Sequence, residues 1–331
     1  MHQHAARNRA YRLAWNEATG QWRPVPEFAR TRGGRRGAVA AGLLLAGLSA
    51  GAAGAAGPSP PAPTQLPTGA TVTAGQVSLH GSGATLDVRQ GSRVGAIDWT
   101  SFDLGSAASV HFLQPDAASV TLNRVTGGDA SRIFGHVDAT GQVFLVNPNG
   151  VYFAPGATVD VGGLVASTLG LGDEDLAAGR LRFARDPSRA AGSVVNEGTL
   201  TARPGGYVAL LAPEVRNPGV VTARLGGVAL AAGDAVTLRM DGHALVGVSV
   251  EPAALQALVD NGGAVITPGG RVLLSARAAS QLAGGVVRNT GVVEATGLAS
   301  RGGRILLEAS DAVDEDGTLS AVGTGGGAGG T

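Results

Sequence analysis

From residue 69 onward, hydrophobic and polar residues alternate in short runs that are separated by Gly, Asn, Asp and Pro. Examples are Val120–Leu122, Val143–Val146 and Val159–Val161. Alternation over a few residues, with turn formers on both sides, predicts β-strands. Helical periodicity is confined to Asp173–Leu181, whose first residues are acids suited to a helix start, and to Pro252–Leu258. The pattern therefore predicts an all-β fold with minor helices.

One pattern repeats in the second half of the chain. The segments Val195–Ala202, Val215–Ala223 and Val287–Ala295 each carry a turn with Asn and Gly, then a short apolar run, and each is followed by a glycine pair and a strand. Asn196 and Asn217 are 21 residues apart, and the glycine pairs behind them keep the same step. A period near 20 residues with strands and no helices predicts a β-solenoid.

Stacked coils would explain the side chains that the repeat uses. Strands of successive coils lie about 4.8 Å apart, and the narrow lumen between them favours Val, Leu, Ile and Ala over aromatic residues. Asn196, Asn217 and Asn289 occupy equivalent corners and are expected to stack as a ladder of amides. Residues 69–331 would then form about a dozen coils, a rod of about 60 Å. An ordinary β-sandwich is the alternative, and a leucine-rich repeat would need more leucine.

Composition and charge exclude several classes of protein. Glycine makes up 54 of 331 residues without a three-residue period, which excludes collagen, and the absence of cysteine excludes thiol catalysis, disulfide scaffolds and cysteine-ligated metal sites. All 25 basic residues are arginine. Residues 1–36 hold eight arginines and two acids, a charge of +6, so the remainder carries −6. An acidic remainder without basic clusters argues against nucleic acid as a partner.

The first 56 residues have the order of a secretory signal. A basic stretch ends at Arg35–Arg36, the 13 apolar residues Ala38–Ala50 follow, and small residues come next. Such a run is too short to span a bilayer, which takes about 20 residues, although a short membrane anchor is the alternative. We expect cleavage after one of Ala52 to Ala56. Residues 57–68 are predicted to be a Pro-rich extended linker.

The long basic region before the apolar run has a pattern of its own, Tyr11–Glu27, with two of the three tryptophans. It resembles the extended signal peptide region of very large exported proteins of Gram-negative bacteria, which include autotransporters and two-partner secretion exoproteins. The resemblance implies export by the general secretory route and a secreted or cell-surface location.

Residues 69–170 contain the most distinctive motifs of the sequence. These motifs lie in Ile97–Gly105, Val110–Gly128 and Ser131–Thr168, and the pattern of these segments predicts strands joined by tight turns. Asp138–Gly141 is predicted to be one turn. Asn147–Gly150, with the sequence NPNG, has Asn, Pro and Gly where a type I turn prefers them.

Taken in order, these motifs resemble the haemagglutination-activity (TPS) domain of two-partner secretion exoproteins, the family of filamentous haemagglutinin and the high-molecular-weight adhesins. The resemblance implies a right-handed parallel β-helix over residues 69–331, with short capping strands. It implies recognition by an outer-membrane β-barrel transporter with POTRA domains, and a monomeric adhesin or haemagglutinin with a host-cell receptor or glycan as further partner.

The resemblance also assigns the candidate site. The residues implied in export are those of an NRV motif and of the NPNG motif: Asn123, Arg124, Val125, Asn147, Pro148, Asn149 and Gly150. Some family members carry an additional NPNL motif, which this sequence lacks. The motifs imply no cofactor and no metal.

Residues for catalysis are sparse. Beyond the leader, His80, His111, His136 and His243 are isolated in sequence and lack the spacing of metal ligands. The acidic clusters Asp173–Asp175 and Asp314–Asp316 are interpreted as a helix start and a turn, so catalytic residues are expected to be none. The alternative is a β-helix enzyme acting on polysaccharides, which would need paired carboxylates in a groove.

Two further questions concern how the chain is exported and whether it is part of a longer protein. A self-transporting protein would end in the amphipathic strands of its own barrel, and the sequence ends without them. The chain also stops within a repeat, since Gly317–Ala321 lacks the strand expected to follow. It is therefore either a short relative of the family or the front of a longer exoprotein.

Overall fold

A computed structural model describes residues 11–16, 21–26, 57–189, 192–242, 244–253, 256–279, 284–297 and 302–323. The chain divides into two units, Met1–Gly54 and Ala55–Thr331. The first contains an antiparallel hairpin of β1 (Tyr11–Asn16) and β2 (Gln21–Pro26), with Trp15 opposite Trp22. The apolar run and the predicted cleavage region, residues 38–56, lie outside the described residues.

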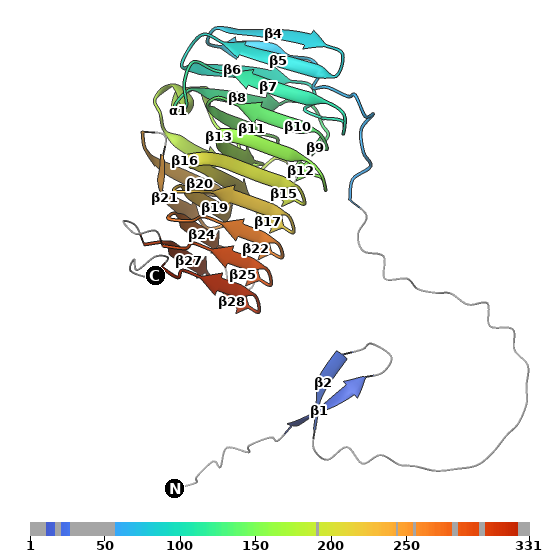
Figure 1. The fold of residues 1–331 in the computed structure, drawn as a ribbon, viewed down its shortest axis with the longest axis vertical. Helices are drawn as coiled ribbons and strands as arrows, with labels where there is room; N and C mark the ends of the chain where they lie inside the picture. The colour runs from blue at the N-terminus through green and yellow to red at the C-terminus, as the bar shows by residue number, and fades with distance from the viewer. Residues whose placement is uncertain are drawn as a thin grey trace, which may run out of the picture. The chain divides into compact units, whose positions relative to one another are not determined.

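The second unit is the right-handed parallel β-helix that the sequence predicted (Figure 1). The strands of the coils lie on three faces, and within each face successive strands pair in parallel from one coil to the next. Parallel pairing between successive coils satisfies the backbone hydrogen bonds of each strand without a hairpin.

Face 1 consists of β9 (Ser131–Ile133), β12 (Val151–Phe153), β15 (Ser193–Asn196), β17 (Glu214–Asn217), β22 (Ala257–Asn261), β25 (Gly285–Asn289) and β28 (Ala312–Glu315). Face 2 consists of β5 (Thr85–Gln90), β7 (Ser109–Leu113), β10 (His136–Ala139), the first parts of β13 (Thr158–Ser167) and β16 (Thr199–Ala212), β18 (Val220–Ala223), β23 (Ala264–Ile266), β26 (Val292–Glu294) and β29 (Thr318–Ser320). Face 3 consists of β6 (Val94–Trp99), β8 (Val120–Val125), β11 (Gln142–Val146), the second parts of β13 and β16, β19 (Gly227–Ala232), β24 (Arg271–Ala276) and β27 (Arg304–Ala309).

Additional elements lie at the start of the helix and outside face 3. The strands β3 (Thr71–Ala74) and β4 (Val77–Ser82) pair antiparallel with β6 and β5 and cap the first coil. The short helix α1 (Asp173–Ala177) and β14 (Leu181–Ala184) leave the coils between β13 and β15. The hairpin of β20 (Ala235–Asp241) and β21 (Ala244–Glu251) joins β14 in an antiparallel sheet. We call this three-stranded sheet the outer sheet.

The lumen is lined by Val, Leu and Ala, as expected for a narrow coil. Val208, Leu210 and Val228 are among its fully buried residues. A second apolar cluster lies between face 3 and the outer sheet, where Phe144 contacts Phe183 with ring centroids 6.0 Å apart. The outer sheet therefore converts the outward side of face 3 into a second core.

The predicted amide ladder exists and has one more member than expected. Nδ2 of Asn196 donates to Oδ1 of Asn217 at 2.7 Å, Asn217 donates to Asn261 at 2.7 Å, and Asn261 donates to Asn289 at 2.6 Å. Asn289 ends the ladder by donating to Oε1 of Glu315 at 2.8 Å. Each amide is thus satisfied by the coil next to it, although the asparagines are fully buried.

Two predictions about the coils are wrong. Face 2, the face with the most strands, has nine in the described residues rather than the dozen or so coils expected, because the capping strands and the outer sheet use residues that were assigned to coils. The helix expected at Pro252–Leu258 is also wrong, since Ala257 and Leu258 begin β22, and residues 254 and 255 lie outside the described part. The predicted helix at Asp173–Leu181 does form, but it ends at Ala177.

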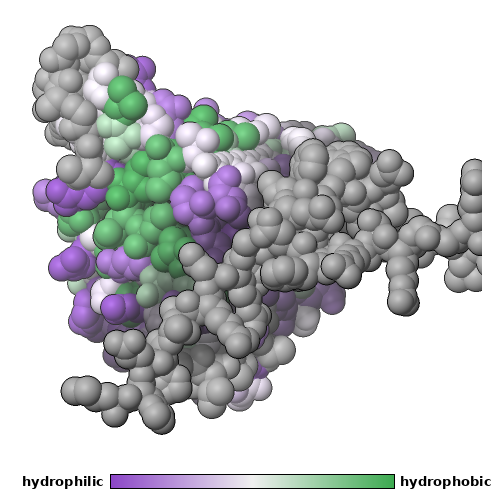
Figure 2. Space-filling view, turned by 90° about the horizontal axis from the view of Figure 1, so that it is seen from below, coloured by the Kyte–Doolittle hydropathy of each residue, from purple (hydrophilic) through white to green (hydrophobic). Residues whose placement is uncertain are grey.

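The last described coil carries large apolar side chains that are only partly buried. Figure 2 looks at this end and shows apolar side chains gathered beside polar ones. Ile305 and Leu307 are only partly buried there, and Val313, Leu319 and Val322 are among the most exposed large apolar residues. No helix within the described residues is long and apolar enough to span a membrane.

Candidate functional site

The NPNG sequence forms the tight turn that was predicted, and it joins β11 on face 3 to β12 on face 1. The amide of Gly150 donates to the carbonyl of Asn147 at 3.0 Å, which closes the four-residue turn. The amide of Asn149 donates to Oδ1 of Asn147, also at 3.0 Å. Gly150 has φ of +133°, a backbone conformation that favours glycine.

The side chains of this turn bind the coil that precedes it. Nδ2 of Asn147 donates to the carbonyl of Asp129 at 2.9 Å and to Oγ of Ser131 at 3.0 Å, and Nδ2 of Asn149 donates to the carbonyl of Gly127 at 2.8 Å. Asn147 is fully buried. Its carboxamide therefore fixes the corner of one coil to the corner of the next.

The NRV sequence lies directly beside this turn, at the end of β8. Asn123 and Arg124 pair in register with Leu145 and Val146, the residues that lead into the NPNG turn. Oδ1 of Asn123 accepts a hydrogen bond from Nε1 of Trp99 at 3.0 Å. The structure thus brings together both motifs, which are stacked in successive coils and are separated by more than 20 residues in sequence.

Arg124 links three parts of the molecule. Its Nε lies 2.8 Å from Oδ1 of Asp98 on β6, its Nη1 binds Asp173 at the start of α1, and its Nη2 lies 3.3 Å from Oγ1 of Thr73 on β3. Burial alone would lower the pKa of Arg124, but the hydrogen bonds that it donates to Asp98 and Asp173 outweigh this effect and raise the pKa. The acidic start of α1 therefore serves an ion pair as well as the helix terminus.

A shallow cleft of about 270 Å³ separates the two motifs from the residues around β14. Arg124 and Val125 line it from β8, Pro148 lines it from the NPNG turn, and Leu171 and Arg189 line it from the other side. Val125 is itself buried. All seven predicted site residues thus lie at one corner of the β-helix, but only parts of them face solvent.

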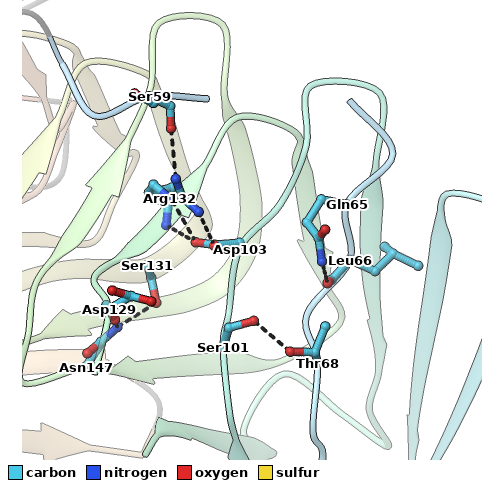
Figure 3. A network of polar contacts seen from close by, with 10 residues as sticks. All are labelled: Ser59, Gln65, Leu66, Thr68, Ser101, Asp103, Asp129, Ser131, Arg132 and Asn147. Atoms are coloured by element: carbon cyan, nitrogen blue, oxygen red, sulfur yellow. Dashed lines mark hydrogen bonds and ion pairs between the residues drawn. The ribbon is translucent and has the colours of Figure 1, made fainter. Parts of the chain in front are cut away.

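Residues 57–68, which we call the strap, contact the first coils although the sequence indicated only an extended segment. Nη1 of Arg132 donates to the carbonyl of Ser59 at 3.0 Å, and Nη2 of Arg132 lies 2.7 Å from Oδ2 of the buried Asp103. Oγ1 of Thr68 lies 2.8 Å from Oγ of Ser101 (Figure 3). Hydrogen bonding of Asp103 raises the pKa of Arg132. No sequence signal identified Asp103 and Arg132, because they are 29 residues apart and belong to no repeat.

The histidines are less isolated than the sequence suggested. His111 on β7 binds Asp138 on β10, and Nε2 of His136 lies 3.4 Å from the same carboxylate oxygen. Neighbouring strands bring them together, since His111 and Asp138 are opposite each other in register. Within the described residues, no three His, Asp or Glu side chains are grouped so that they could hold a metal ion. His243 lies outside the described residues.

The second acidic cluster also differs from its prediction. Asp314 and Glu315 belong to β28, and only Asp316 lies in the turn before Gly317. The groove of about 310 Å³ between β21 and β24 is lined by Arg239, Arg271 and Arg304, with Glu308 as its carboxylate. This groove lacks the carboxylate pair that the polysaccharide-acting alternative requires.

The comparison with known families agrees with the fold. A family described as the TPS secretion domain matches residues 64–321. The chain belongs to the TPS secretion domain family. Residues 8–56 match the extended signal peptide of the type V secretion system, so this TPS chain carries the leader of an exported Gram-negative protein.

Relatives and solved structures support the same assignment. Two heme/hemopexin-binding proteins of Haemophilus influenzae, one of them from strain KW20 / Rd, are similar to this TPS chain. The Rd protein is 35% identical over 253 residues and the other is 32% identical over 250 residues, which is 74% and 68% of the chain. The chain spans about a quarter of their length, 27% and 26%.

The HMW1 secretion domain from Haemophilus influenzae superimposes with a TM-score of 0.72 and 28% identity, covering 78% of this chain and 67% of that one. The filamentous hemagglutinin secretion domain has a TM-score of 0.53 at 17% identity, covering 79% of this chain and 97% of that one, and shows the likeness of fold. The comparisons support a secretion function and not the enzyme alternative.

Proposed function

We propose that residues 57–331 are the part of a two-partner secretion exoprotein that an outer-membrane transporter with periplasmic POTRA domains recognises, and that the NRV and NPNG motifs are read before the coils fold. The observation that carries this proposal is the burial of the motifs. Asn123 and Asn147 have no exposed surface, and Gly150 and Val125 are also buried. A partner could contact these groups only in a chain that has not yet stacked its coils.

The side chains of the two motifs are suited to recognition by the transporter while the chain is still extended. The carboxamides of Asn123, Asn147 and Asn149 each offer donors and an acceptor, and after folding the Nδ2 group of each donates to a main-chain carbonyl of a neighbouring coil. An extended segment can also add as a strand to the edge of a POTRA sheet, where main-chain hydrogen bonds give affinity and alternate side chains give selectivity. Folding outside the cell would then hide the signal and oppose return.

The experiment is a secretion assay of Asn147→Ala in cells that contain the partner transporter. We expect the secreted amount to fall about tenfold, the effect of losing about 1.4 kcal/mol from one recognised side chain. Secretion of this variant at the level of the natural chain would contradict the proposal.

A matched control separates recognition from folding. Asn217→Ala also removes a fully buried corner amide that bonds two neighbouring coils, but it lies outside both motifs. We expect the control to lower the stability of the folded protein and to leave secretion near the natural level. Equal loss of secretion in both variants would show that the defect lies in folding.

The similarity to the HMW1 secretion domain supports placing adhesion or another surface-binding activity in the whole exoprotein. We propose that the β-helix displays such surfaces for a host-cell receptor or glycan and acts as a monomer. Binding of cells to the purified exoprotein, compared with binding to residues 57–331 alone, tests where that activity resides.

A further inference from the structure

The far end of the strap lies against a tyrosine of face 1. A Cβ built at Gly57 would be 2.5 Å from the hydroxyl oxygen of Tyr152 and 3.1 Å from its Cζ. Backbone nitrogen and Cβ of one residue are about 2.5 Å apart, so the nitrogen of Gly57 lies within about 5 Å of that hydroxyl. Glycine lets the strap approach this closely, because a larger residue would push the tyrosine hydroxyl aside.

Tyr152 in turn orients a carboxylate. Its hydroxyl donates to Oε2 of Glu197, which follows β15 in the next coil. Glu197 is half-buried, and within the described residues it forms an ion pair with no arginine or histidine. The nearby cation Arg132 is held by Asp103 and by the carbonyl of Ser59. Glu197 therefore accepts a hydrogen bond from Tyr152, but no cationic side chain of the described residues pairs with it.

Gly57, the first residue after the leader, lies next to this pair. The family match of the extended signal peptide stops at residue 56. Signal peptidases need small residues at the first and third positions before the cut, and Ala56 and Gly54 supply them. Hydrolysis of the peptide bond between Ala56 and Gly57 consumes one water and leaves a carboxylate on Ala56 and an ammonium on Gly57. A terminal α-amino group has an ordinary pKa of about 8, so it is mostly charged at neutral pH.

We propose that the leader is cleaved between Ala56 and Gly57 and that the new α-ammonium of Gly57 binds the carboxylate of Glu197 beside Tyr152. The site takes a chain terminus as its ligand. Its effect is to fasten the strap across the first coils, from Tyr152 at one end to the contact between Thr68 and Ser101 at the other. Because the ammonium exists only after cleavage, leader removal itself stabilises the start of the β-helix.

The test has two measurements. Mass spectrometry of the secreted protein is expected to give Gly57 as the first residue, and a different first residue overturns the proposal. The second compares thermal unfolding of chains that begin at Gly57 with chains that begin at Ala55, each with Glu197 or with Glu197→Gln. The chain that begins at Gly57 should melt about 3 °C higher when Glu197 is present, and the difference should vanish with Glu197→Gln.

Equal melting temperatures of the two natural-sequence chains would overturn the proposal, as would a difference that persists in Glu197→Gln. Acetylation of the Gly57 amine supplies an independent control, because it removes the charge and changes no side chain. It should lower the melting temperature as much as Glu197→Gln does. The melting comparisons use purified chains and do not depend on the transporter, and the first residue is set by leader cleavage and not by recognition of the motifs. Failure of either measurement therefore leaves the proposed function untouched.

Discussion

At the scale of the residue, buried amides hold the corners of the coils. Asn196, Asn217, Asn261 and Asn289 bond to one another, while Asn123 and Asn147 bond to main-chain carbonyls. The sequence predicted three members of the ladder from their spacing. It missed Asn261 because the hairpin of the outer sheet lengthens the step from Asn217 to 44 residues. The contacts of Asn147 were not predictable, since they depend on which carbonyls the preceding turn presents.

The first prediction concerns the ladder. Asn217→Ala removes two hydrogen bonds of 2.7 Å and leaves Asn196 and Asn261 each with an unsatisfied buried group. We expect a loss of about 2–4 kcal/mol in the free energy of unfolding, measured by urea denaturation. As a control, Thr222→Ala on the outward side of face 2 should change the free energy of unfolding by less than about 0.5 kcal/mol. A loss no larger than that of Thr222→Ala would contradict the role of the ladder.

The second prediction concerns alkaline pH. Burial, the hydrogen bond to Glu197 and the charge of Glu197 raise the pKa of Tyr152 to about 12, from an ordinary value of 10. Because the folded state binds this proton more tightly than the unfolded state, its stabilisation is complete below pH 10 and is lost as the pH rises toward 12. Burial also raises the pKa of Tyr207, so the natural chain must be compared with Tyr152→Phe. The urea midpoint of the natural chain should fall relative to that of Tyr152→Phe between pH 10 and 12. A difference that stays constant over this range would contradict this account.

At the scale of the element, the outer sheet decides how face 3 is buried. Outward residues of β16 and β19 such as Tyr207, Ala209 and Ala229 are fully buried because β14 and the β20–β21 hairpin lie over them. Sequence periodicity predicted the strands of the coils well, since each repeats with its neighbours. It could not predict the outer sheet, because alternating strands of a hairpin and of a coil look alike until their partners are known.

The third prediction addresses this element. Phe183 is fully buried on β14 and packs on Phe144 of β11. Phe183→Ala should cost about 3–5 kcal/mol, measured by urea denaturation, and should speed hydrogen exchange in β14 and β20 more than in face 1. Arg182→Ala on the same strand removes an exposed ion pair of 2.9 Å to Glu251 and should cost less than about 1 kcal/mol. Uniform acceleration across all faces would contradict a separate outer core.

At the scale of the whole molecule, coils contact mainly the coils next to them, so stability should vary along the axis. The start of the β-helix is capped by β3 and β4 and tied by Arg124 and the strap, while the last described coil leaves Ile305 and Leu307 partly exposed. The sequence predicted the repeating architecture and the tight turn at Asn147–Gly150. It overestimated the number of coils because insertions of different length share the composition of the repeats.

The fourth prediction follows from this asymmetry. Backbone amides of β16 and β19 should exchange with solvent more slowly than those of β27 and β29, as measured by hydrogen exchange followed by mass spectrometry. Slower exchange at β27 and β29 would contradict the description of the last coil as the less protected end.

The central claim is that the NRV and NPNG motifs are recognised before folding buries them. The direct measurement is the affinity of the periplasmic part of the partner transporter for residues 57–331, first for the chain held unfolded and then for the same chain after refolding. We expect the unfolded chain to bind at least about tenfold more tightly, a difference of about 1.4 kcal/mol or more, and Asn147→Ala to reduce this difference. Equal or tighter binding of the folded chain would contradict the claim.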